Sequence, residues 1–453
     1  MIMYHLRRFQ TLLVGTLFCI HLIGDALPAS AESPKPPLAG AVTTLGDAPW
    51  PIPPVAKQVK KRPKTVEIYQ FDKTAIDNRA PLLMVHGLLG EYWADCFRWR
   101  KLATYLQRDP AFVKRYKIVF ARYDTKAPMQ EVIPGFRQAL TDVSAAFGEQ
   151  PLTVVALSMG GNMMQMAMQD PVMDKRIKSV LTMGTPFHGS PLFSNKWMEY
   201  SMLRHYHTPI SRLDTAFAYR MYFDRHKNLL SDLRWDNSDG FIPDVGHFRF
   251  YFPMSSHGDL TPSSTANTYV ASLNKDHDVD KSKFTVYGGY MLNDFAKMKG
   301  NDFASILKLP YKVTFTLVPE HFGREHPVLR ALNQHIARAI VASPDVLKAD
   351  GTRYAYGLND GITPVTSAIF LPNAALPGLA VTDETVEKLG KHVDVKRARV
   401  FRNIDHLTFI DDYHPLLAPA ELKDQLAPNE AARPIFEWIK NDVMEDKSIA
   451  DHF

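Results

Sequence analysis

Apolar residues along this chain occur in short continuous runs that alternate with longer segments of helical spacing. The continuous runs predict strands, because a strand buried on both faces of a parallel sheet needs no polar positions. The predicted strands are Val66–Phe71, Pro81–His86, Lys117–Tyr123, Leu152–Leu157, Ile177–Met183, Phe284–Tyr290, Tyr311–Val318 and Arg397–Arg402. The predicted helices are Arg98–Gln107, Gln130–Phe147, Met159–Gln169 (ended by Pro171), Pro327–Ala342 and Asn429–Val443. This alternation indicates an α/β fold, a mostly parallel sheet with helices on both faces.

The alternation lapses between Met183 and Phe284, a stretch too long for an ordinary connection. We therefore predict a lid or cap inserted at residues 191–283, between the two halves of one domain at 64–190 and 284–453. Aromatic residues and methionines crowd this insertion. They fit either a small helical core packed on the sheet or a mobile lid over an apolar site.

The first residues of the chain have the pattern of an export signal. Arg7 and Arg8 precede an apolar run, and Ala29 and Ala31 offer small residues for cleavage. A retained membrane anchor is the alternative. It is disfavoured because the run is shorter than the roughly 20 apolar residues that a membrane span needs. We predict a signal peptide at residues 1–31, an extended proline-rich leader at 32–63, and a secreted or periplasmic mature protein.

Composition and charge restrict the partners of the protein. The 453 residues are 45% hydrophobic and carry a net charge of +5, which is too small to indicate binding to nucleic acid. One of the two cysteines, Cys19, lies in the predicted signal, so the remaining Cys96 has no partner for an internal disulfide. We expect Cys96 to be a small buried hydrophobic residue.

The first candidate for chemistry is Ser158, which stands where a β-branched run ends and a helical segment begins. A sharp turn between a strand and a helix presents a side chain to substrate, and it requires small neighbours. Ala156, Gly160 and Gly161 meet that requirement. Ser158 is therefore the predicted nucleophile.

A serine nucleophile needs a base, an acid that orients the base, and donors for the oxyanion. The sequence Val85-His-Gly-Leu-Leu-Gly90 follows a predicted strand and breaks it with glycines, which frees backbone N–H groups for an oxyanion hole. We predict Leu88 as the first donor. Met159, which follows the nucleophile at a helix N-terminus, is the second.

These segments resemble the α/β-hydrolase superfamily, and more narrowly its secreted bacterial lipases and esterases, related to lecithin:cholesterol acyltransferase-like and GPI inositol-deacylase-like hydrolases. The loop Met183–Ser190 resembles the one that such lipases carry after the strand following the nucleophile. Their acid lies on an Asn-Asp-Gly turn followed by proline and Ser-Ala. Asn359–Ala368 fits this pattern, so the resemblance implies Asp360 as the acid. The chain order of nucleophile, acid and base then gives His406, just beyond the last predicted strand, as the base.

Other residues compete for these roles. Asp294 follows the predicted strand Phe284–Tyr290, where the acid stands in a minimal hydrolase, but its neighbours lack the glycine and proline. His414 is the alternative base. His188 is a poor candidate for the base because it follows the predicted strand Ile177–Met183 too closely. Lipases of the resembled type often carry a calcium-binding aspartate two residues after the histidine, whereas this chain has Thr408 there. We expect no metal and no cofactor, and we expect Asp405 to lie on the surface.

The resemblance and the residues together predict a serine hydrolase that cleaves carboxylic esters, with lipid esters of the acylglycerol type as substrates. The expected partner is a lipid or ester substrate, met at a lipid interface. A phospholipase, a GPI inositol-deacylase-like enzyme and an acyltransferase on the same residues stay open as alternatives. A binding protein on an inactive hydrolase fold is the third hypothesis.

Overall fold

The computed structural model describes residues 50–53, 63–88, 90–92, 94–190, 232–233, 273–274, 279–291, 352–354, 357–371, 380–382, 385–402, 404–410 and 432–445. The predicted signal peptide, most of the leader and most of the predicted lid lie outside these residues, as do the predicted strand Tyr311–Val318 and helix Pro327–Ala342. Within the described part, no helix has the length and hydropathy that a membrane span requires.

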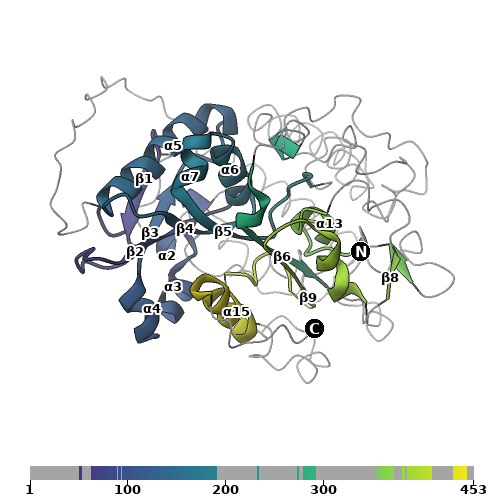
Figure 1. The fold of residues 1–453 in the computed structure, drawn as a ribbon. Helices are drawn as coiled ribbons and strands as arrows, with labels where there is room; N and C mark the ends of the chain where they lie inside the picture. The colour runs from purple at the N-terminus through teal and green to yellow at the C-terminus, as the bar shows by residue number, and fades with distance from the viewer. Residues whose placement is uncertain are drawn as a thin grey trace, which may run out of the picture.

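A seven-stranded sheet forms the centre of the protein (Figure 1). Its order is β1-β3-β2-β4-β5-β6-β9, and every neighbouring pair is parallel except β1 with β3. The strands are β1 (Glu67–Gln70), β2 (Ala80–Val85), β3 (Tyr116–Arg122), β4 (Leu152–Leu157), β5 (Ile177–Met183), β6 (Phe284–Tyr290) and β9 (Arg397–Arg402). The prediction of a mostly parallel α/β sheet is confirmed.

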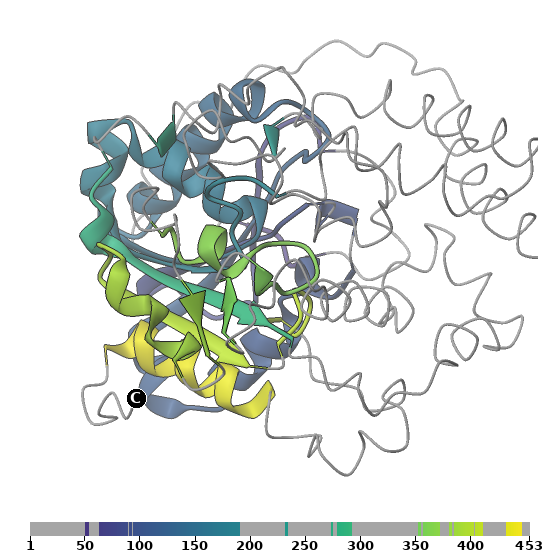
Figure 2. The ribbon, with the colours of Figure 1, turned by 90° about the vertical axis from the view of Figure 1, so that its right-hand side faces the viewer.

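Helices cover both faces of this sheet (Figures 1 and 2). One face carries α5 (Met129–Ala146), α6 (Met159–Met168), α7 (Pro171–Arg176) and α13 (Val365–Ala368), and the other carries α3 (Arg100–Gln107), α4 (Pro110–Arg115) and α15 (Ala432–Met444). Shorter elements are η1 (Gly90–Tyr92), α2 (Ala94–Phe97), η4 (Lys281–Lys283), η10 (Val386–His392), and a two-stranded sheet of β7 (Arg353–Tyr354) and β8 (Ala380–Val381).

Strand β2 shows why the central strands have continuous apolar sequences. Leu83 and Val85 pack into the core on the α5 and α6 face, whereas Leu82 and Met84 pack into the core on the α3 and α15 face. Successive side chains of a strand point to opposite faces, so a strand covered on both faces must be apolar at every position.

Two short helices begin at prolines, in contrast to the expectation that Pro171 only ends a helix. Helix α7 begins at Pro171, and α4 begins at Pro110. In each case the preceding aspartate, Asp170 or Asp109, caps the helix through its side chain. Proline suits the first position of a helix because its missing N–H is not needed there.

Helix α15 joins the two halves of the sequence on one face of the sheet. Its Asp442 is buried and accepts two hydrogen bonds of 2.9 Å from Arg399 of β9 and one from the hydroxyl of Tyr287 of β6. At its end, the carbonyl oxygens of Val443 and Met444 accept bonds from Tyr116 and Arg115, at the start of β3.

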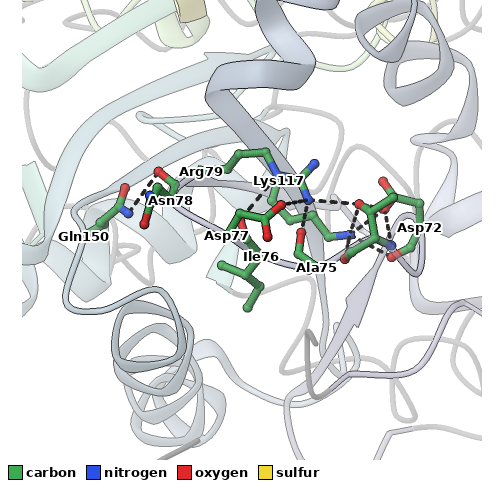
Figure 3. Close-up of polar contacts among 9 residues, drawn as sticks. Asp72, Ala75, Ile76, Asp77, Asn78, Arg79, Lys117 and Gln150 are labelled. Atoms are coloured by element: carbon green, nitrogen blue, oxygen red, sulfur yellow. Dashed lines mark hydrogen bonds and ion pairs between the residues drawn. The ribbon is translucent and has the colours of Figure 1, made fainter. Parts of the chain in front are cut away.

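At the opposite edge from the carboxyl ends of the strands, a buried lysine organises the loop between β1 and β2 (Figure 3). The Nζ of Lys117 lies 2.5 Å from Oδ1 of Asp72, 2.9 Å from its carbonyl oxygen, 2.7 Å from the carbonyl oxygen of Thr74 and 3.0 Å from its hydroxyl. Burial lowers the pKa of Lys117, and the carboxylate of Asp72 opposes that effect. Four oxygens therefore satisfy one buried ammonium group.

We expect Lys117→Met to lower the free energy of unfolding by roughly 1–3 kcal/mol, because it keeps the apolar stem but removes the charged donor that the oxygens of Asp72 and Thr74 share. Urea denaturation of the variant measures this loss. Lys114→Met, at an exposed position of α4, is the matched control. Equal stability of the two variants would contradict the role assigned to the Lys117 ammonium.

Candidate active site

The chain turns sharply at Ser158, between β4 and α6. Ser158 is buried and has a φ of 52°, a conformation that residues other than glycine rarely adopt. Its N–H donates to the carbonyl oxygen of Met183 at the end of β5 (2.8 Å), and its carbonyl oxygen accepts the N–H of Gly161 (2.9 Å). A strained turn held in this way has the backbone form expected of a nucleophile elbow.

The segments beside this turn approach too closely to admit side chains. A Cβ on Gly160 would lie 2.7 Å from the carbonyl oxygens of Val85 and His86, and one on Gly161 would lie 2.0 Å from the hydroxyl of Thr185. That hydroxyl donates to the carbonyl oxygen of Ser158 (3.0 Å). The prediction that the neighbours of Ser158 must be small is confirmed.

The predicted acid, Asp360, lies on a buried turn. Its Oδ1 accepts the N–H groups of Ile362 (2.9 Å) and Thr363 (2.6 Å). Gly361, between Asp360 and Ile362, has a φ of 92°, which only glycine adopts without strain. The turn meets the end of β6, because the N–H of Met291 donates to the carbonyl oxygen of Asn359 (3.2 Å).

The predicted base, His406, is joined to Asp360 by two hydrogen bonds. Its Nδ1 lies 2.8 Å from Oδ2 of Asp360, and its main-chain N–H donates to the carbonyl oxygen of Asp360 (3.0 Å). An acid that engages Nδ1 fixes the orientation of the imidazole ring and favours the tautomer with Nε2 available as a base.

A short segment, Met183 and Gly184, lies between the serine turn and this pair. Met183 accepts the N–H of Ser158, as described above. A Cβ on Gly184 would lie 2.8 Å from Nδ1 of His406 and 2.9 Å from Oδ2 of Asp360. The structure thus brings the three predicted triad residues to one edge of the sheet, at the carboxyl ends of β4, β5, β6 and β9.

The predicted oxyanion donors lie beside Ser158. A Cβ on Gly87 would lie 2.8 Å from the Cβ of Ser158, so the turn that contains Leu88 is in direct contact with the serine. Met159 is the first residue of α6. In the part of the chain that the structure describes, the N–H groups of Leu88 and Met159 donate to no protein acceptor. Among those residues, no acceptor competes with a developing negative charge for either N–H group.

His86, which precedes this turn, is a buried neutral histidine. Burial lowers its pKa to about 3. Its Nε2 lies 3.3 Å from the N–H of Tyr123, its Nδ1 lies 2.8 Å from the carbonyl oxygen of Gly87, and its ring stacks on that of Tyr123 at 4.4 Å. These partners assign the proton to Nδ1 and give His86 a structural role at the start of the turn.

The expectation that Asp405 lies on the surface is wrong. Asp405 is buried, and its carboxylate accepts the N–H groups of Leu407 (2.9 Å) and Thr408 (3.2 Å) and the hydroxyl of Thr408 (2.9 Å). A charged group tolerates burial when several donors satisfy it. Asp405 therefore shapes the turn that carries His406, and Thr408 contributes to that turn.

Two residues with no predicted role also hold the acid in place. Thr363 donates its hydroxyl to the carbonyl oxygen of Gly184 (3.0 Å), and Ser367 donates to that of Gly189 (2.9 Å). The sequence placed both residues within the Asn359–Ala368 pattern but gave neither of them a role. Their acceptors lie far away in the chain, so the sequence alone did not reveal the contacts.

Of the other residues singled out in the sequence, the structure describes His188 and Cys96. His188 is buried, with Nε2 2.9 Å from the carbonyl oxygen of Leu371 and Nδ1 3.2 Å from the amide of Asn274, which are structural contacts. Cys96 is buried, as expected. Asp294 and His414 lie outside the described residues. Among those that are described, no group of three or more His, Cys, Asp or Glu side chains could hold a metal ion.

Comparison with known proteins identifies the fold. A family model described as the alpha/beta hydrolase fold matches residues 80–208, which contain β2 to β5, the turn at Leu88 and Ser158. The protein has the α/β-hydrolase fold. A search of curated protein sequences gave no match to this chain.

Solved structures with this hydrolase fold are only distantly similar. The mature lipase of Bacillus licheniformis is 15% identical, with a TM-score of 0.32 over 80% of this chain and 92% of that one. A metagenomic carboxyl esterase is 13% identical, with a TM-score of 0.32 over 81% and 76%. The phospholipase PlaB of Legionella pneumophila is 15% identical, with a TM-score of 0.29 over 47% and 39%.

The close approach at Gly161 gives a test of the serine turn in this hydrolase fold. We expect Gly161→Ala to lower the free energy of unfolding by about 1–3 kcal/mol, because the added Cβ displaces Thr185. Gly135→Ala, in helix α5, is the matched control, since its Cβ would meet only Val66 at 3.6 Å. Thermal denaturation of both variants measures the difference, and equal midpoints would argue against the tight packing described for Gly161.

Proposed function

We propose that this protein is a serine hydrolase that cleaves carboxylic esters through an acyl-enzyme. The observation that carries the proposal is the hydrogen-bonded pair of Asp360 and His406 beside the strained turn of Ser158. This pair supplies the base and the orienting acid that a serine needs to act as a nucleophile, and all three residues lie at one edge of the sheet.

In the proposed mechanism, Oγ of Ser158 attacks the ester carbonyl carbon while Nε2 of His406 accepts the hydroxyl proton. The carbonyl oxygen becomes a tetrahedral oxyanion, stabilised by the N–H groups of Leu88 and Met159. When the oxyanion collapses, the bond to the alcohol oxygen breaks and His406 returns the proton to the leaving alcohol. Water then attacks the acyl-enzyme with His406 as base, releasing the acid and restoring the serine.

We further propose that the ester is a lipid ester and that the chain is exported. The support for the lipid ester is the resemblance of Met183–Ser190 and Asn359–Ala368 to lipase segments, together with the aromatic composition of residues 191–283. The support for export is the pattern of residues 1–31. The fold alone is compatible with many substrates.

Ser158→Ala should abolish hydrolysis of p-nitrophenyl esters, tested with acyl chains of increasing length, and should abolish labelling by a fluorophosphonate probe. The control is Ser282→Ala, a substitution at an exposed position within η4 that should leave both signals unchanged. Turnover by the Ser158 variant at the wild-type rate would exclude this serine as the nucleophile.

The choice between the two acids can be tested directly. Asp360→Asn should lower kcat by roughly 10⁴-fold, the size reported for the equivalent change in a serine protease, because the imidazole loses its orienting charge. Asp294→Asn should retain activity within a few-fold of wild type. The reverse ranking of the two variants in steady-state kinetics would assign the acid to Asp294.

A further inference from the structure

The turn that carries Leu88 ends in a buried carboxyl group that the proposed mechanism does not use. Glu91 has no exposed surface. Its two carboxyl oxygens each lie 2.9 Å from the hydroxyl of Thr125, and Oε1 also accepts the N–H of Thr125 (3.1 Å). Its carbonyl oxygen accepts a bond from Nε of Arg122 (3.1 Å), whose Nη1 is directed to Glu67.

Glu91 is one of two anchors on the same neighbouring segment. At the start of the turn, His86 stacks on Tyr123 and accepts its hydroxyl at the main-chain carbonyl oxygen (2.8 Å). At the end, Glu91 binds Thr125. Between the anchors, the N–H of Gly90 donates to the carbonyl oxygen of Gly87 (3.0 Å). The direction of the Leu88 N–H therefore depends on the segment that follows β3, which holds the turn at both ends.

The surroundings of Glu91 favour its protonated form. Burial raises the pKa of Glu91 to about 7, and the nearby negative charge of Asp124 acts in the same direction. Among the described residues, the titratable and charged groups that face it are Arg122, Tyr123 and Asp124. A protonated carboxyl donates one bond and accepts others, and Thr125 offers both a hydroxyl oxygen and an N–H to match it.

We propose that Glu91 is a positioning residue, whose hydrogen bonds to Thr125 hold the Leu88 N–H in the direction that the tetrahedral oxyanion requires. This inference rests on the proposed function. It assigns to a second carboxyl of the chain a role distinct from that of Asp360, because Glu91 acts on the oxyanion turn and contacts neither Ser158 nor His406. Loss of its bonds should weaken stabilisation of the transition state more than binding of the ester.

The test compares Glu91→Gln with Glu91→Leu in steady-state hydrolysis of a p-nitrophenyl ester. Glutamine retains a donor and an acceptor for Thr125, so kcat should stay within about 3-fold of wild type. Leucine retains neither, so kcat should fall by about 10- to 100-fold with little change in KM. Glu67→Leu is the matched control: it removes a carboxyl that binds Arg122 but does not touch the turn, and it should leave kcat unchanged.

Thr125 gives an independent arm if Glu91→Leu fails to fold. Thr125→Ser keeps the hydroxyl and should retain wild-type kcat, whereas Thr125→Val should lower kcat as Glu91→Leu does. Wild-type kcat in both Glu91→Leu and Thr125→Val, with Ser158→Ala inactive, would overturn the positioning role and leave the proposed function intact. Activity in Ser158→Ala would instead overturn the proposed function.

The pH dependence of the free energy of unfolding gives a second test, independent of the enzyme kinetics. Since the pKa of Glu91 is raised from 4.5 to about 7 in the folded state, the folded protein holds a proton there that the unfolded chain has released. Wild type should therefore lose stability relative to Glu91→Gln as the pH rises from about 4.5 to about 7, and not beyond. A difference that does not change with pH would contradict the protonated carboxyl.

Discussion

The candidate active site depends on one position at the end of β5 where no side chain fits. The N–H of Gly184 donates to the main-chain carbonyl oxygen of Tyr287 in β6 (2.9 Å). The carbonyl oxygen of Gly184 accepts the hydroxyl of Thr363 (3.0 Å). The space that a Cβ would occupy is filled by His406 and Asp360. The strands, the serine turn and the predicted acid–base pair can therefore meet here only because Gly184 has no side chain and adopts a φ of 56°.

The position of the predicted acid, Asp360, is a tertiary property rather than a local one. Strand β6 ends at Tyr290, and the next described residues with a role in the site begin at Gly357. The acid turn is nevertheless attached to the end of β6, through the bond from Met291 to Asn359. A segment distant in sequence thus occupies the place where a minimal hydrolase would carry its acid directly after the strand.

The sequence allowed the sheet to be predicted well, for a physical reason. Strands β4, β5, β6 and β9 have the predicted bounds. In β4 and β6 every position is buried, which leaves little freedom in composition, whereas β9 is an edge strand that carries three arginines. Helices α4 and α7 were missed, since Pro171 was interpreted as the end of the preceding helix and the caps Asp109 and Asp170 were overlooked.

The residues of the candidate site differ in how far the neighbouring sequence reveals their environment. Ser158 could be found because its turn is encoded by adjacent small residues. Glu91 was overlooked because its donor, Thr125, lies 34 positions away and meets it only after folding. Asp405 was wrongly assigned to the surface although its donors are its close neighbours Leu407 and Thr408, because its burial depends on the rest of the fold. The glycine and proline after Asp360 favoured it over Asp294 in the sequence, but its contact with His406, made across the fold, is visible only in the structure.

Helix α15 has a consequence for the order in which the protein can assemble. The bond between Arg115 and Met444 spans 329 positions, and Tyr116 is tied to Val443 over a similar distance. During synthesis, α3 and α4 are available early to cover this face of the sheet, but the part that α15 covers stays exposed until that helix has emerged. Contacts of such long range slow the final closure of a domain. A late truncation of this chain would therefore damage structure that was synthesised first.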